Sequence, residues 1–182
     1  KIGKEKILVE KMEEEIKNEG NGKFPLDLQV AKITEIKDHP DADKLVVMQI
    51  DLGDARTKSG TNEVGEERRL VAGLKPDYNV EELQDKKIIV VKNLQPAKLR
   101  GIMSQGMLLA GDDGKEIGLL TVDESEPGDK VYFEGYENSK EEISFKDFQK
   151  IKMIVKGGNA YFEDKVLKTD KEEIKVEKVK DG

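Results

Sequence analysis

The sequence predicts an all-β protein, a small barrel of short strands, and three observations support this prediction. Short apolar runs, several of them alternating with polar residues, recur between turn signals about every ten residues. Helical periodicity is confined to brief stretches. Strands do not alternate with long helices along the chain, so the sequence does not predict a parallel α/β sheet. The length of 182 residues suits one domain with appendages.

At the N-terminus we expect a helix over residues 4–19, because apolar residues recur there at every fourth position among Glu and Lys. The glycine-containing stretch 20–22 would end it. Residues 1–23 are therefore predicted to be a helical extension or linker.

Beyond this extension the apolar period changes to two, starting with Leu26, Leu28 and Val30, which predicts strands. A helical turn is expected at 80–83. The expected strands, in chain order, cover residues 26–36, 44–50, 70–72, 87–91, 106–110, 117–120 and 130–133.

The aromatic residues are unevenly placed, since seven of the nine lie beyond position 131. Disordered tails are poor in aromatic residues, so we expect the end of the chain to be folded and packed against the rest. The predicted organisation is the extension 1–23, a barrel domain 24–136 and a small C-terminal subdomain 137–182 packed on the barrel.

The formal net charge of −7 is also unevenly distributed. Residues 1–23 and 137–182 are each neutral, and residues 24–136 hold 15 basic and 22 acidic groups. Within them, residues 86–106 carry five Lys and Arg and no acid. Such a segment on an acidic body is typical of a phosphate-binding face, although lysines also guard strand edges against aggregation. Charge alone leaves both interpretations open.

The composition excludes several kinds of site. Without Cys the chain has no disulfide, no thiolate zinc site and no Cys nucleophile. One His, at position 39, cannot provide a zinc triad, and no phosphate-binding loop, nucleophile elbow or EF-hand is complete. We therefore expect no catalytic residues, no metal, no cofactor and no enzymatic activity. Neither a spanning apolar run nor a signal segment is present, so we expect a cytoplasmic protein without membrane contact.

Two motifs carry the most information. One runs from His39 to Leu45 and reads HPDADKL, and the other runs from Asn93 to Met107 and reads NLQPAKLRGIMSQGM. With the intervening Arg69–Leu74 segment they strongly resemble the tRNA-binding domain appended to methionyl-tRNA synthetases. Similar domains occur in stand-alone dimeric bacterial tRNA-binding proteins and in synthetase cofactors such as endothelial monocyte-activating polypeptide. The resemblance covers residues 26–136 and implies a five-stranded oligonucleotide-binding (OB) barrel.

The resemblance implies a non-catalytic module that binds tRNA and delivers it to an aminoacyl-tRNA synthetase, a methionyl-tRNA synthetase first of all. Between Pro25 and Val131 the one aromatic residue is Tyr78. Base stacking is therefore expected to contribute little, and contacts to phosphates and to the shape of folded RNA are expected instead.

The expected RNA contacts come from five cations and two neutral donors. They are Lys32, Lys44, Lys92, Asn93, Lys98, Arg100 and Ser104. A second group is expected to shape the backbone around them or to lie in the core. It consists of His39, Pro40, Asp43, Gly73, Pro96, Gly101, Gly106 and Met107.

The two prolines have specific predicted effects. Pro40 and its flanking Asp residues fix a turn that aims Lys44. Pro96 interrupts the fourth strand, so that the following cations, Lys98 and Arg100, project from a loop or bulge. The glycine after Arg100 has no side chain and lets a phosphate approach the backbone.

Two departures from the family pattern predict weak intrinsic RNA affinity and a need for a synthetase chain. Residues 29–32 carry one positive charge fewer than the family's usual string, and residues 55–67 form an enlarged hairpin tip with three Glu.

Residues 137–182 resemble the C-terminal extension with which endothelial monocyte-activating polypeptide and its relatives imitate a second subunit. This resemblance implies a pseudo-dimeric monomer. The alternative is a protein-binding domain of the same family, resembling an export chaperone or a cytokine.

Overall fold

The computed structural model describes residues 22–53, 67–75 and 77–181 of the protein. The helix expected at 4–19 and nearly all of the hairpin tip expected at 55–67 lie outside the described residues. The described chain is all-β, which confirms the predicted class. No helix in these ranges is long and apolar enough to cross a membrane.

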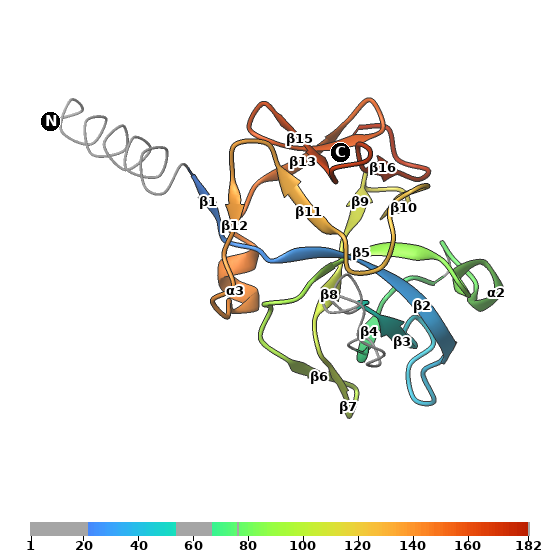
Figure 1. Ribbon diagram of the computed structural model, residues 1–182. Coiled ribbons are helices and arrows are strands. Elements are labelled where there is room, and N and C mark those ends of the chain that lie inside the picture. The colour runs from blue at the N-terminus through green and yellow to red at the C-terminus, as the bar shows by residue number, and fades with distance from the viewer. Residues whose placement is uncertain (1–21, 54–66, 76, 182) are drawn as a thin grey trace, which may run out of the picture.

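The elements follow one another as short strands interrupted by two single-turn helices (Figure 1). In the first half they are β1 (Lys23–Phe24), β2 (Leu28–Asp38), β3 (Val46–Asp51), β4 (Glu67–Ala72), α2 (Val80–Leu83), β5 (Lys87–Val91), β6 (Ala97–Leu99) and β7 (Ile102–Ser104). In the second half they are β8 (Met107–Leu108), β9 (Ala110–Asp112), β10 (Ile117–Thr121), β11 (Lys130–Phe133), β12 (Glu137–Asn138), α3 (Phe145–Phe148), β13 (Met153–Lys156), β14 (Asn159–Phe162), β15 (Lys165–Lys168) and β16 (Lys175–Val176).

The predicted strand 106–110 is divided, and the division has a physical reason. β8 pairs with β5, whereas β9 pairs with β10. Between them the Leu109 N–H donates to the Ile89 carbonyl, and the Leu109 carbonyl accepts from the Leu120 N–H. The chain thus changes partner at Leu109, which its apolar pattern does not reveal.

β2 organises the sheet, because it pairs antiparallel with β3, β5 and β11. Its register against β3 shifts between Ile33 and Glu35, where a β-bulge bends the strand. The Thr34 hydroxyl at the bulge donates to the Gln49 carbonyl at 3.2 Å. Among the described residues the main path of pairings runs open from β4 to β9 and does not close into a ring.

The described residues form two apolar cores. The first is built mainly from β2 to β5 and α2 and includes Ile33, Met48 and Leu70. The second joins Phe24 and Phe133 to side chains from the last strands of the chain. β11 pairs with β15, so the sheet itself continues into the C-terminal segment, whose strands β13 to β16 lie at the end of the molecule opposite β6 and β7 (Figure 1).

The chain end is attached to the body through Glu177. Its carboxylate accepts from the Tyr78 hydroxyl at 2.9 Å and from the Lys86 ammonium at 2.8 Å. Burial is the largest effect on the pKa of Tyr78 and raises it, and the Glu177 carboxylate raises it further. The Leu119 N–H, which donates to the phenol oxygen, lowers the pKa and partly offsets this rise. A Cβ on Gly118 would lie 1.5 Å from the Glu177 carbonyl, so the crossing of the two segments requires glycine there.

A second attachment is made by the Glu172 carboxylate. It accepts hydrogen bonds from the main-chain N–H groups of Asp123, Glu124 and Ser125 and from the Ser125 hydroxyl, at 2.6–2.8 Å. Burial alone would raise the pKa of this carboxyl, but the hydrogen bonds outweigh burial and lower the pKa to about 2. The loop between β10 and β11 is thereby tied to the C-terminal segment.

Replacing Glu172 by Gln is expected to lower the free energy of unfolding at neutral pH by about 1–2 kcal/mol, allowing for solvent screening. Because the folded pKa lies below the ordinary 4.5, the stabilisation is full above pH 4.5 and lost as the pH falls toward 2. Urea denaturation between pH 7 and pH 2 would measure it. The control is Glu173→Gln, which replaces the exposed neighbouring carboxylate. If the free energy of unfolding of both variants depended on pH in the same way, this role of Glu172 would be contradicted.

Candidate nucleic-acid interface

The second motif forms a two-stranded hairpin at the end of the molecule opposite the C-terminal segment. β6 and β7 pair antiparallel, and the turn between them consists of Arg100 at φ 52° and Gly101 at φ 86°. Two positive φ values in a two-residue turn match the twist of a hairpin. The predicted loop or bulge is therefore a β-ribbon, which presents the exposed side chains of Lys98 and Arg100.

His39 joins this hairpin to the turn made by the first motif. Its ring is 5% exposed. Nδ1 accepts from the Asp41 N–H at 3.0 Å, so Nε2 carries the proton and donates to the Leu99 carbonyl at 3.2 Å. The His39 N–H also donates to the Leu45 carbonyl, which closes the turn before β3. The turn that contains Lys44 is thus fastened to the hairpin that contains Lys98.

Two of the predicted RNA contacts need correction. The amide nitrogen of Asn93 donates to the carbonyls of Pro25, Ser139 and Glu141, and its oxygen accepts from the Asp27 N–H. Asn93 thus uses its donors to hold three segments together.

Ser104 is also engaged inside the protein. Its hydroxyl accepts from the Val71 N–H and donates to the Gly106 carbonyl, both at 3.0 Å. Both side chains are less than 10% exposed. Neither has a donor left for a phosphate, and both support the hairpin instead.

β4 contributes two arginines that the sequence reasoning missed. Arg68 donates to the carbonyls of Lys92 and Gln105, at 2.7 and 3.2 Å. Arg69 is exposed, and no described residue accepts a hydrogen bond from its guanidinium or forms an ion pair with it. The strand was predicted to begin at Leu70, but cross-strand pairing extends it to Glu67. Extending the apolar alternation back from Leu70 could have included both arginines.

The acid-free segment 86–106 is not one strip in space. Lys86 forms an ion pair with Glu177 and Lys87 with Glu126, and both lie on the side of the C-terminal segment. Lys32, on β2, pairs in register with Asp51 and Lys87, away from the hairpin. The cations near the hairpin are therefore Lys44, Lys92, Lys98 and Arg100, together with the two arginines of β4.

A groove follows β4 beside the hairpin, formed by three adjoining hollows. The first and second share Gln49 and Arg69, and the second and third share Arg68 and Gln105. We call it the β4 groove. Its other polar lining residues include Lys37, Lys92 and Lys140 and the acids Glu35, Glu67 and Glu142. Two arginines and three lysines against three acids suit an extended polyanion better than a small anion.

Of the other motif residues, Pro96 lines the third hollow of this groove. Pro40, Asp43 and Pro96 are exposed. Gly106 has φ 142°, and a Cβ there would lie 3.0 Å from the Val91 carbonyl. Met107 is half-buried against the second core. Gly73 has ordinary space around it, with Leu45 as the nearest side chain.

The described residues contain no group of three or more His, Asp or Glu side chains that could hold a metal ion. The arrangement offers cations and hydrogen-bonding groups that suit the binding of an anionic ligand.

Comparison with known proteins shows one family. A family model with the description "Putative tRNA binding domain" matches residues 28–130. The methionine–tRNA ligase of Pyrococcus abyssi is 56% identical over 98 residues, which are 54% of this chain and 12% of that enzyme. The chain thus spans a small part of this curated relative.

Two solved structures extend the comparison. The C-terminal domain of Plasmodium vivax p43 superposes with a TM-score of 0.73 at 29% identity, covering 86% of this chain and 94% of that one. The CsaA chaperone protein of Picrophilus torridus gives a TM-score of 0.50 at 31% identity, over 59% of this chain and 92% of the chaperone. Similarity to p43 therefore reaches into the C-terminal segment.

Proposed function

The chain belongs to the tRNA-binding domain family, and on this premise we propose that it is a cytoplasmic, non-catalytic module that binds tRNA at the β4 groove and the adjoining hairpin. Recognition uses phosphate contacts and the shape of the folded RNA more than base sequence. The RNA-contacting cations are Lys44, Lys92, Lys98, Arg100 and Arg69, and Lys32 would contact only an RNA that extends beyond the groove.

The observation that carries this proposal is the pairing state of the cations. Within the described ranges, Lys44, Lys98, Arg100 and Arg69 form no ion pair. On the C-terminal segment Lys168, Lys171 and Lys175 are paired with Glu134, Asp129 and Asp123. Lys152 and Lys156 there pair with no described acid, but they do not lie beside the groove. Arg69 lines the β4 groove. Lys98 and Arg100 lie on the adjoining hairpin, and Lys44 lies on the turn fastened to it. Because these four cations pair with no acid in the described part of the chain, their charge is available to phosphates, and a bound polyanion releases its counterions there.

We propose that the module delivers tRNA to a synthetase, in the same chain or in another, and that this enzyme is a methionyl-tRNA synthetase. The 56% identity to the Pyrococcus enzyme supports this assignment. The acids Glu35, Glu67 and Glu142 on the groove reduce the local positive charge. Intrinsic affinity for tRNA is then modest, and the enzyme's own contacts add to it.

We also propose that residues 24–136 form an OB barrel and that residues 137–182 are a built-in substitute for a second subunit. The second core supports this idea, because Phe24 and Phe133 pack there with Leu167 and Ile174. The similarity to p43, which covers most of both chains, also supports it.

A protein-binding, chaperone-like role is the second candidate. The similarity to CsaA favours it. So do two apolar side chains at the hairpin, Leu99 and Met103, which are 38% and 39% exposed. Against it, the cations of the groove would have no role in holding an apolar peptide.

Removing the hairpin cations in Lys98→Ala/Arg100→Asn is expected to weaken tRNA binding about tenfold to hundredfold. Asn tolerates the positive φ at position 100, so the turn is kept. The slope of log affinity against log salt should fall by roughly one for each lost phosphate contact. Fluorescence anisotropy with labelled tRNA across a salt series measures both quantities.

The matched control is Lys152→Ala/Lys156→Ala, which removes two exposed cations from the C-terminal segment. It should bind like the original protein. Equal loss in both double variants would mean that net charge and not the groove governs binding. Equal affinity for tRNA and for single-stranded DNA would point to a general OB-type binder.

The built-in second subunit predicts a monomer. Sedimentation equilibrium at micromolar concentration should give the mass of one chain, because the apolar surface available for dimerisation is already covered. A stable homodimer would contradict this part of the proposal.

A further inference from the structure

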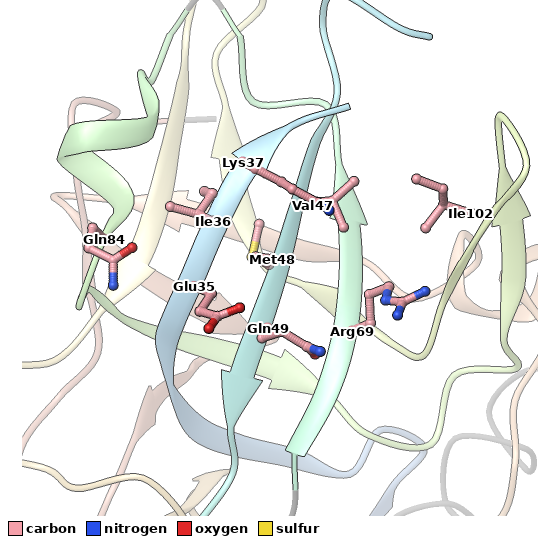
Figure 2. A pocket seen from close by; sticks show the side chains of 9 residues that line it. All are labelled: Glu35, Ile36, Lys37, Val47, Met48, Gln49, Arg69, Gln84 and Ile102. Atoms are coloured by element: carbon pink, nitrogen blue, oxygen red, sulfur yellow. The ribbon is translucent and has the colours of Figure 1, made fainter. Parts of the chain in front are cut away.

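The outer face of β2, β3 and β4 carries one row of polar side chains. The pairing places Glu35 opposite Gln49 and Gln49 opposite Arg69. Opposite residues of antiparallel strands point to the same face, and Figure 2 shows the three side chains in one row across the strands. The bulge at Thr34 sets this register.

The row lies in the first hollow of the β4 groove, which has a volume of 440 Å³. Its apolar walls are Val47 from the sheet and Ile102, which faces the sheet from the hairpin (Figure 2). Ile36 adjoins the hollow but packs against the first core on the other face. A hollow of this size with apolar walls and a few polar groups is typical of a small-ligand site.

The polar groups of the row are available to a ligand. The Glu35 carboxylate, the Gln49 amide and the Arg69 guanidinium form no hydrogen bond or ion pair with any described residue. Gln84, which also lines the hollow, is engaged, since its amide donates to the Thr34 carbonyl at 2.6 Å. Across the row, the Glu35 carboxylate is an acceptor, the Gln49 amide is both donor and acceptor, and the Arg69 guanidinium is a donor.

This order matches one nucleobase. Guanine carries two adjacent donors, N1–H and the N2 amino group, which a carboxylate can accept together, and its O6 and N7 accept from an amide or a guanidinium. Adenine, cytosine and uracil lack two adjacent donor nitrogens. The ring faces can contact the aliphatic walls without an aromatic stack.

We propose that this hollow binds one unpaired guanine of the RNA, with Glu35 accepting from its N1 and N2 and with Gln49 and Arg69 donating to its O6 and N7. Lys37 lines the same hollow, and Ile102 belongs to the hairpin that carries Lys98 and Arg100, so cations for the neighbouring phosphates lie on both the sheet and the hairpin. This inference rests on the proposed function and adds a base-specific contact to it.

The test uses uridine hexanucleotides with a single central G, A or C, the all-uridine hexanucleotide, and GMP. The protein should bind the G-containing hexanucleotide about tenfold more tightly than the other three. Glu35→Gln should abolish the preference, whereas the exposed control Glu124→Gln should keep it. Glu35 is exposed, so the variant should fold, and its thermal unfolding is compared with that of the control.

A second readout needs no variant. The Gln49 side-chain amide and the Ile102 methyl groups should shift in NMR spectra when the G-containing hexanucleotide is added. Equal binding of all four hexanucleotides, or a preference that survives in Glu35→Gln, would overturn the guanine site. So would GMP binding as tightly as the hexanucleotide, or an apolar peptide producing these shifts when RNA does not. If tRNA still binds in these cases the proposed function stands, whereas failure of tRNA to bind at all would refute that function itself.

Discussion

The arrangement of the candidate interface depends on one buried side chain, His39. Its imidazole accepts from the Asp41 N–H and donates to the Leu99 carbonyl, so it holds the turn before β3 and the β6–β7 hairpin together. The base of the hairpin is held to β4 through Ser104 and Gln105, and the His39 bond to Leu99 holds its tip. Without the ring, the tip of the hairpin would lose its attachment to the turn that carries Lys44, and the separation of their cations would be less well fixed. Contact with the phosphates of a folded RNA requires a fixed separation, because phosphates in a helix have fixed spacing.

The surrounding structure supports the same geometry from the other side. Ser104 fixes β7 to β4 through the Val71 N–H, and Arg68 joins β4 to the carbonyls of Lys92 and Gln105. These bonds engage polar groups within the protein, and they define the walls of the β4 groove. The exposed groups, Arg69 and the hairpin cations, are therefore held by neighbours whose polar groups are engaged within the protein. The C-terminal segment covers the opposite end, where Glu172 and Glu177 attach it (Figure 1).

The sequence allowed the strands to be predicted well where local alternation decides them, as at 87–91 and 130–133. The site was predicted only in part, because exposure and pairing depend on distant residues. Lys86 and Lys87 belong to the acid-free segment, yet their carboxylate partners lie 91 and 39 positions further along the chain. Asn93 has the chemistry of an RNA donor, but three distant carbonyls occupy its amide. Arg69 joins the site only through its register with Gln49, which no local pattern encodes.

The most direct test of this account removes the His39 ring and follows tRNA affinity and the hydrogen exchange of the hairpin amides together. In His39→Ala we expect faster exchange over residues 97–104, kept protection in β2 to β5, and a loss of tRNA affinity of about tenfold. His39→Gln, whose amide can still donate to the Leu99 carbonyl, should recover part of both. Unchanged tRNA affinity in a protein whose hairpin exchanges freely would contradict the account, because binding would then not depend on the geometry that His39 maintains.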